Sequence, residues 1–301
     1  MHILLTGGTG LLGRALCAAL LADGHQLSVL SRRPHKVAAL CGPGVQALVS
    51  LDDWLPDMHF DAVINLAGAP IIDLPWTTAR KQTLWASRIT LTEQLVTALQ
   101  RAERKPAVLL SGSAIGIYGD CAEAPCSDSA AVPNPAPADF AAQLCAAWET
   151  AARQASTPDT RVSLLRTGLV LAPHGGLLAR MRLPFRLGLG ARLGDGQQWM
   201  SWIHLDDWVA AVLHLLAQPD AHGACNLTAP QPVRNADFSA ALANCFGRRV
   251  HLAAPASVLR LLLGQRAGLL LDSQRVLPDR LLATGYAFRH PELRSALQSL
   301  S

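Results

Sequence analysis

The chain has 301 residues, half of them hydrophobic, which suits one large domain or a core with a smaller lobe. Its net charge of +4 comes from scattered arginines without a dense basic block, so we expect no nucleic-acid partner. Seven cysteines without a CxxC pair argue against a disulfide framework or a metal site and fit a reducing cytoplasm. The N-terminus lacks a basic leader, and the apolar stretch 258–271 is too short to span a bilayer, so we expect a cytoplasmic protein without membrane contact.

The first predicted element is a strand that runs directly into a glycine-rich turn. The apolar run 3–5 precedes three glycines at three-residue spacing, and a helical apolar period follows from residue 15. Such a turn lets the backbone approach a diphosphate, and the helix start offers it free N–H groups. We therefore predict a dinucleotide site with contacts from Gly7, Thr9, Gly10, Leu11, Leu12 and Gly13.

The second predicted strand, residues 26–30, ends at Ser31, Arg32 and Arg33. NAD-binding proteins place an acid here for the ribose hydroxyl, whereas a guanidinium can hold a 2′-phosphate with paired hydrogen bonds. We therefore predict NADP(H), with Arg32 as the main contact; the alternative is a pair of solvated loop arginines. After the third strand, 45–49, Asp52 is a further candidate for contact with the adenine end.

The fourth predicted strand, 61–66, leads into small residues that would let the backbone lie against the cofactor. Leu66, Ala67 and Gly68 are the predicted contacts. In the helix that follows, roughly 77–104, Arg88 either faces the nicotinamide half or is solvated.

After the fifth strand, 107–111, come Ser113 and Tyr118, then a proline-rich loop at 121–139 that we expect to form a lid. A helix at 140–155 and a sixth strand at 161–165 complete this part of the chain. We place a nucleotide-binding core at 1–172, with later segments returning to it up to about residue 230, and a substrate lobe at 173–301.

In the second lobe, several polar and aromatic side chains could line a cleft over the cofactor. Arginines can hold phosphates, tryptophans can stack a sugar or base, and a histidine can move protons. The candidates are Arg186, Trp199, Trp202 and His204. The alternative is a solvated basic loop with tryptophans in the core and a structural histidine at a helix start.

Five segments in order, at 65–68, 113–120, 184–190, 198–204 and 274–278, resemble the epimerase-family group of atypical, extended short-chain dehydrogenases. The resemblance covers essentially the whole chain. It implies an α/β fold with a doubly wound parallel Rossmann sheet, a smaller C-terminal α/β lobe, a nicotinamide cofactor, and a C-terminal domain of undefined role at about 248–297. Ala69 departs from the group, which usually has glutamate after Ala-Gly.

The resemblance also exposes a missing catalytic pair. Classical members use Tyr-x-x-x-Lys, but neither Tyr118 nor Tyr286 lies four residues before a lysine, and residues 140–145 read FAAQLC where the motif belongs. By position, Ser113 would polarise a reacting carbonyl, with Ser111 as the alternative. Tyr118 is the best remaining acid, although it could equally be a packing residue.

Two functions follow from these observations. The first is an NADP(H)-dependent oxidoreductase or epimerase acting on a small molecule that is sugar-nucleotide-like or phosphorylated. The alternative is a non-catalytic NADP(H)-binding sensor or scaffold, because the usual pair is absent. We expect a monomer or homodimer.

Overall fold

A seven-stranded parallel sheet forms the centre of the molecule in the computed structural model, which describes residues 1–132 and 134–300. Its order is β12-β7-β5-β4-β1-β2-β3. The strands are β1 (His2–Thr6), β2 (Gln26–Leu30), β3 (Gln46–Leu48), β4 (Ala62–Asn65), β5 (Val108–Ala114), β7 (Arg161–Thr167) and β12 (Gly223–Leu227). The chain reverses its direction of winding between β1 and β4, which is the topological switch point where doubly wound folds bind ligands.

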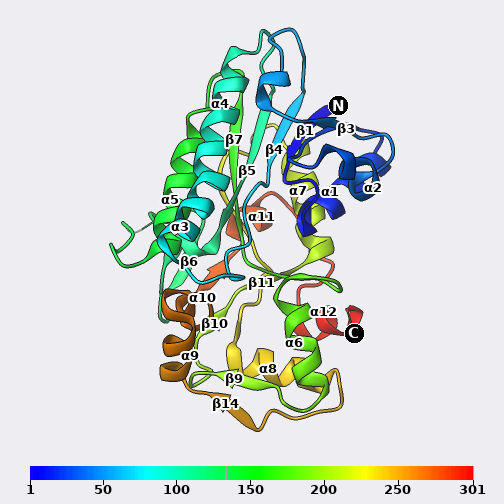
Figure 1. Ribbon diagram of the computed structural model, residues 1–301. Coiled ribbons are helices and arrows are strands. Elements are labelled where there is room, and N and C mark those ends of the chain that lie inside the picture. The colour runs from blue at the N-terminus through cyan, green and yellow to red at the C-terminus, as the bar shows by residue number, and fades with distance from the viewer. Residues whose placement is uncertain (133, 301) are drawn as a thin grey trace.

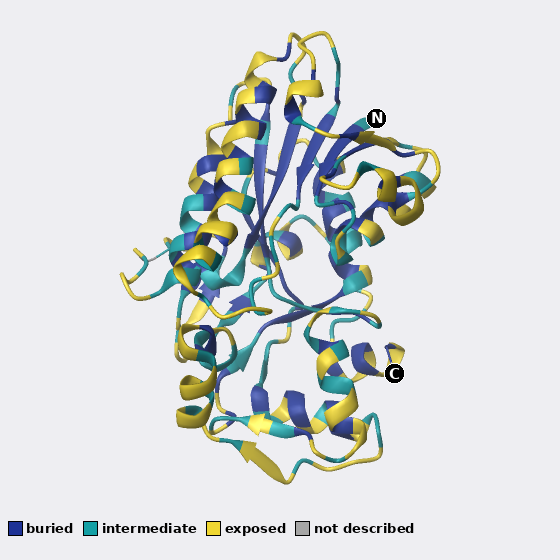
Figure 2. Cartoon of the chain, in the orientation of Figure 1, coloured by how far each residue is buried: buried dark blue, intermediate teal, exposed yellow. Residues whose placement is uncertain are grey.

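Helices cover both faces of this sheet, as the apolar character of its strands requires (Figure 1). One face packs against α1 (Leu11–Ala22), α2 (Val37–Cys41) and α7 (Leu205–Ala217). The other packs against α4 (Leu91–Arg101) and α5 (Phe140–Arg153), with α3 (Thr78–Trp85) and the π-helical turn η3 (Ala86–Thr90) before α4. Figure 2 shows the strands of the sheet as almost continuously buried. The predicted α/β Rossmann fold is confirmed.

The second lobe lies beyond the carboxyl ends of the strands and has its own apolar core (Figure 1). Trp202, Phe238 and Leu297 are among the side chains buried in that core. Its elements are β8 (Leu169–Leu171), α6 (Gly176–Arg186), β9 (Ala191–Leu193), β10 (Trp199–Met200), β11 (Trp202–His204), β13 (Val233–Arg234), α8 (Asn235–Asn244), β14 (Leu252–Ala254), α9 (Ala256–Leu263), α10 (Gly268–Leu271) and α12 (Leu293–Ser299). Two later elements, β15 (Arg275–Leu277) and α11 (Asp279–Ala283), pack against the first lobe.

Segments from the second half of the chain return to the first lobe. β12 pairs with β7 as the edge strand of the main sheet, and α7 packs on α1. Strand β6 (Pro125–Ser127) lies within the stretch 121–139, which the sequence suggested was one long loop, and it pairs in parallel with β15. The C-terminal segment therefore contacts both lobes.

Candidate functional site

The glycine turn between β1 and α1 is built by close backbone contacts. Gly7 has φ +72°, and a Cβ on it would lie 2.6 Å from the carbonyl carbon of Leu66. A Cβ on Gly13 would lie 2.3 Å from the Gly7 carbonyl oxygen. Gly10 precedes α1, and no side chain caps the helix start. The N–H groups of the first turn, next to Thr9, Leu11 and Leu12, are therefore open to an anionic ligand.

At the end of β2 the structure places two exposed cations beside the turn. The backbone N–H of Arg33 donates to the Oγ of buried Ser31 at 3.1 Å. Neither Arg32 nor Arg33 makes a side-chain hydrogen bond or ion pair with the described residues. No acid competes for them on this strand end, which suits a phosphate. Asp52 lies beyond β3 on an exposed turn, where its carboxylate accepts from the Ser50 hydroxyl.

A buried polar chain holds the end of β4 next to the glycines. The Thr6 hydroxyl donates to Asn65 Oδ1 at 2.6 Å and accepts from the Ala67 backbone N–H at 3.1 Å. These bonds fix the segment from Leu66 to Gly68 against Gly7. Thr6 was not predicted as a site residue, although a threonine at the end of an otherwise apolar strand was a signal.

Arg88, on η3, lies over the same strand end. A Cβ on Gly68 would come within 2.9 Å of the Arg88 guanidinium carbon, and the guanidinium stacks 5.3 Å from the ring centre of Trp148. Its Nη1 is buried and has no hydrogen-bond partner within residues 1–132 and 134–300. Burial lowers the pKa of Arg88. A buried donor without a partner beside a glycine turn suits a ligand hydroxyl or phosphate.

Ser113 and Tyr118, the predicted catalytic pair, belong to one buried network. The Ser113 hydroxyl donates to Glu149 at 2.8 Å, and Glu149 forms a two-point ion pair with Arg166 at 2.7 and 2.9 Å. Arg166 donates to the Tyr118 hydroxyl at 2.9 Å, and that hydroxyl donates to Asn226 at 2.8 Å. Burial opposes a charge on Arg166, but the Glu149 pair outweighs it and raises its pKa. Glu149 and Arg166 were not predicted as site residues.

This network restricts what Tyr118 can do. Burial raises the pKa of its phenol, and Arg166 only partly offsets that effect. Tyr118 itself lines the cavity described below, but its hydroxyl bonds to Asn226, Arg166 and the Ser127 carbonyl, none of which lines that cavity. The geometry therefore favours the packing alternative over a free acid for Tyr118.

Residues of the stretch 140–145, where the missing pair belongs, do face the cavity. Ala141 and Cys145 lie four residues apart on α5, and both line the wall. An ideal Cβ on Gly116 would lie 3.9 Å from the side chains of both. Burial raises the pKa of the Cys145 thiol to about 12, so it is not a base at neutral pH. Neither position carries a group that exchanges protons readily.

A cavity of about 1050 Å³ opens beside Leu11, between the two lobes. It is lined by residues 114–120 after β5, by the first turns of α5, and by 167–169. The remaining walls come from residues 70–76, the start of α6, and residues 265–274. A cavity that adjoins the glycine turn at the switch point is the expected place for a substrate.

The comparisons with known proteins agree with this arrangement. Residues 3–227 match the model of the NAD dependent epimerase/dehydratase family. The chain belongs to this family. Residues 254–300 match a second model, described only as a domain of unknown function (DUF1731). The predicted family resemblance, including the C-terminal domain, is confirmed.

Relatives share the full length of the chain. The epimerase family protein SSP1921 of Staphylococcus saprophyticus is 38% identical, with 99% of each chain covered. The chloroplastic SDR39U1 homolog of Arabidopsis thaliana is 36% identical over all of this chain and 86% of its own. The crystal structure of human epimerase family protein SDR39U1 with NADPH has a TM-score of 0.90 at 34% identity, covering 100% of this chain and 99% of that one. Within the described residues, no helix combines the length and apolarity that a membrane crossing needs.

The four predicted substrate residues do not line the cavity. Trp202 is fully buried in the second core, and its indole N–H donates to the Gln231 carbonyl, so it cannot stack a ligand. His204 is buried, and its Nδ1 accepts from the Asp206 N–H at the start of α7, which is the structural alternative. Each residue is fixed by its role in the fold.

The other two substrate candidates lie on outer parts of the second lobe. Trp199 stacks against Arg234 at 4.0 Å and Arg275 at 5.1 Å, and its indole N–H donates to Glu123. Its ring is thus occupied by protein partners. Arg186 is exposed at the end of α6, away from the cavity wall.

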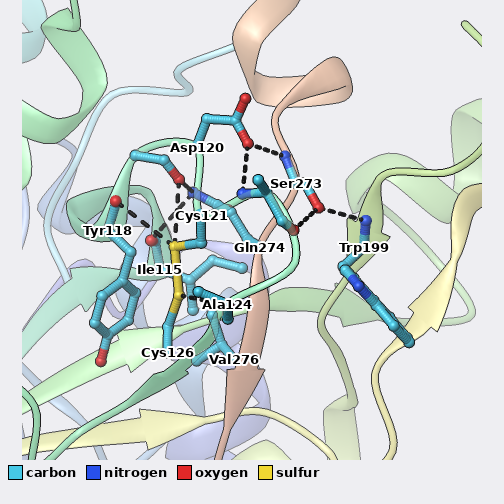
Figure 3. Close-up of a disulfide and its surroundings, with 12 residues drawn as sticks. Ile115, Tyr118, Asp120, Cys121, Ala124, Cys126, Trp199, Ser273, Gln274 and Val276 are labelled. Carbon is cyan, nitrogen blue, oxygen red and sulfur yellow. Dashed lines mark hydrogen bonds between the residues drawn. A yellow bond between two sulfur atoms is a disulfide. The ribbon is translucent and has the colours of Figure 1, made fainter.

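The sequence analysis expected no disulfide framework, and the structure differs at one place, where the C-terminal segment meets the first lobe. Cys121 and Cys126 are joined by a disulfide (Figure 3). Around it, Ser273 donates its N–H to Asp120 at 3.1 Å, and the Gln274 amide donates to the Gly119 carbonyl at 3.0 Å. Figure 3 also shows the Tyr118 phenol directed away from Ser273 and Gln274. The matched domain of unknown function is thereby attached beside the cavity.

Proposed function

We propose that this protein binds NADP(H) at the glycine turn and acts as a short-chain-type oxidoreductase or epimerase on a small molecule in the adjoining cavity. The observation that carries the cofactor choice is the end of β2, which has no acid and where the exposed Arg32 and Arg33 side chains pair with none of the described residues. A 2′-phosphate would complete their hydrogen bonding, whereas an NAD ribose would gain nothing from two guanidinium groups. The human relative that was crystallised with NADPH supports the same choice.

The rest of the site fits such a cofactor. The contact between Gly7 and Leu66 leaves room only for backbone, and the bare start of α1 suits a diphosphate. The Arg88 guanidinium lies against Gly68, close enough to Cys145 to interact with it electrostatically, and its Nη1 has no hydrogen-bond partner among the described residues. We assign Arg88 to the ribose or phosphate of the nicotinamide half, where it would supply the positive charge of the absent lysine.

When bound, a nicotinamide cofactor accepts or supplies a hydride. The part of this chain is then to position the substrate and to polarise its carbonyl, and the proton that accompanies the hydride would come from solvent. Ser113, directly before the lining residues 114–120, is nearest to the classical polarising position, and its hydroxyl would have to turn away from Glu149 to donate to a carbonyl. Tyr118 stabilises that group through Arg166 and does not supply a proton itself.

A second function, a cofactor-binding sensor or scaffold without turnover, is favoured by one observation. In the stretch that would carry the catalytic tyrosine and lysine, Ala141 and Cys145 face the cavity. A protein of this kind would bind NADP(H) and would not exchange hydride.

Ligand-induced stabilisation tests the cofactor. We expect NADPH to raise the melting temperature of the full chain more than NADH does, because only NADPH offers a phosphate to Arg32. Arg32→Ala should reduce NADPH affinity by roughly tenfold, the loss of one charge-assisted contact. Arg104→Ala, which removes an exposed cation elsewhere, is the matched control. An equal response to NADH and NADPH would refute the assignment.

Isotope transfer separates the two functions. With deuterium on the reactive carbon of NADPH, an oxidoreductase should pass the label to members of a carbonyl library, as detected by mass spectrometry. If NADPH binds tightly and no label moves to any compound, the sensor or scaffold is favoured.

A further inference from the structure

We propose that the cavity beside the glycine turn binds a small, largely apolar molecule that carries a protonated amine, held by the carboxylate of Asp272, and not a nucleoside diphosphate sugar. This rests on the proposed function, because it names the substrate class of the same site. It also gives the C-terminal domain a role, since Asp272 lies within residues 254–300.

The walls of the cavity are mainly apolar. Trp76 and Phe140 meet edge to face, with ring centres 5.1 Å apart, and both line the space. Aliphatic side chains surround them, namely Ile71, Ile72, Ile115, Leu177 and Leu269. Such a surface gains free energy by covering hydrocarbon or an aromatic ring, and it offers few hydrogen bonds to the hydroxyls of a sugar.

The charges in the wall are the opposite of what a diphosphate needs. Among the described lining residues, four of the five charged side chains are carboxylates. Arg180 is the cation of the set, and its guanidinium pairs with Asp73 at 2.5 Å. Asp120, Asp139 and Asp272 remain, so the wall has a net negative charge that would repel phosphates and attract a cation.

Asp272 is the carboxylate that is free to bind. Asp139 caps α5 by accepting the Ala142 N–H at 2.9 Å, and Asp120 accepts the Ser273 N–H at 3.1 Å. The Asp272 carboxylate accepts no hydrogen bond from the described residues. An ammonium group has three donors and would both satisfy Asp272 and relieve its repulsion by Asp120 and Asp139.

The C-terminal segment holds Asp272 at a fixed place. Asp272 follows α10, and the N–H of its neighbour Ser273 donates to Asp120 (Figure 3). The Ser273 hydroxyl donates to the carbonyl of Ala122. Strand β15 then pairs with β6. Asp272 is therefore held in place by the hydrogen bonds of Ser273 and by the β6–β15 strand pair that follows. A residue that determines specificity needs such a fixed position.

Calorimetric titration of the full chain, saturated with NADPH, tests the proposal. The probes are phenethylamine, phenethyl alcohol, phenylpropionate and uridine diphosphate glucose, which differ in charge and polarity. We expect the amine to bind at least tenfold more tightly than the alcohol, and the two anions not to bind. Tighter binding of uridine diphosphate glucose or phenylpropionate than of the amine would overturn the proposal.

Variants locate the amine. Asp272→Asn should weaken amine binding about tenfold and leave NADPH affinity unchanged, whereas Asp57→Asn, which removes an exposed carboxylate elsewhere, should change neither. Leu269→Trp, which fills the cavity, should abolish amine binding and retain NADPH binding. This second variant tests the site if Asp272→Asn does not fold. Undiminished amine binding by a folded Asp272→Asn or Leu269→Trp protein would refute the site. Failure of NADPH to bind the unaltered chain would instead refute the proposed function.

Discussion

At the scale of single residues, Glu149 connects the greatest number of groups around the site. Its carboxylate accepts from Ser113, from Arg166 at two points and from Arg153 at 2.9 Å. It is nevertheless 97% buried, since only 3% of its side chain is exposed. A buried carboxylate with this many donors is stable only while its ion partner stays in place. The network therefore fixes the end of β5 under the cavity.

Replacing Glu149 tests that dependence. Glu149→Gln removes the charge that balances Arg166 and should lower the free energy of unfolding by about 3–5 kcal/mol. Urea denaturation measures the loss. Glu103→Gln, at an exposed position whose side chain bonds to none of the described residues, should change the value by less than about 0.5 kcal/mol. A cost for Glu149→Gln no larger than that of the control would show that the network does not stabilise the fold.

At the scale of elements, the start of α7 ties the C-terminal segment to the main sheet. Buried Asp207 accepts the backbone N–H groups of Arg289 and His290, both at 2.8 Å, and the Tyr286 hydroxyl at 3.1 Å. Tyr286 packs against the core cluster that includes α1 and α7. A single carboxylate thus organises the approach to α12.

Asp207→Asn is expected to loosen this segment. The loss of a charged acceptor for three donors should cost about 2–4 kcal/mol and expose residues after about 275 to proteolysis, followed by mass spectrometry. Asp206→Asn is the matched control, because Asp206 is exposed and shares the favourable position at the helix start. Equal cleavage rates in both variants would contradict the anchoring role.

The elements that sequence could predict are those determined by local spacing. The glycine turn was recognisable because Gly7, Gly10 and Gly13 must stand at fixed distances between a strand and a helix. The positions of the main strands along the chain followed from the short apolar segments between helical stretches. The long helix after β4 was also placed well, although η3 within it was not foreseen.

The site residues that sequence could not assign depend on tertiary contacts. From sequence, Trp202 could equally stack on a ligand or pack in a core. Only the tertiary structure shows that it belongs to the core. In the sequence, Glu149 is one polar residue of an amphipathic helix and Arg166 stands at the end of a strand, so neither is recognisable as a site residue. Asp272 faces a cavity whose other walls come from residues about 150 and 200 positions earlier, namely Asp120 and Asp73. Separations of this size leave no local pattern.

At the scale of the whole molecule, the two ends of the site carry opposite charges. The end of β2, with Arg32 and Arg33, is basic, whereas the cavity on the other side of the glycine turn is acidic. Electrostatic attraction would bring an anionic cofactor to one end of the site and a cationic substrate to the other. This separation would discourage either ligand from occupying the other's place.

The same acidity makes stability depend on pH. Burial, with the nearby charges of Asp120 and Asp139, raises the pKa of Asp272 from 3.8 to about 6, and Arg260 only partly opposes this. An acid with a raised pKa in the folded state holds its proton more tightly than in the unfolded chain. The contribution of Asp272 to the free energy of unfolding is therefore most favourable below about pH 4, and it is lost as the pH rises through about 6.

Asp272→Asn removes this contribution and should change stability in a pH-dependent way. After allowance for solvent screening, the variant should be more stable than the unaltered chain by about 1–2 kcal/mol at about pH 7.5, with a much smaller gain at about pH 4. Urea denaturation at both pH values measures the difference, with Asp57→Asn as the control for loss of one surface charge. Since both proteins share every other titrating group, a gain of equal size at the two pH values would mean that the charge of Asp272 is not the cause.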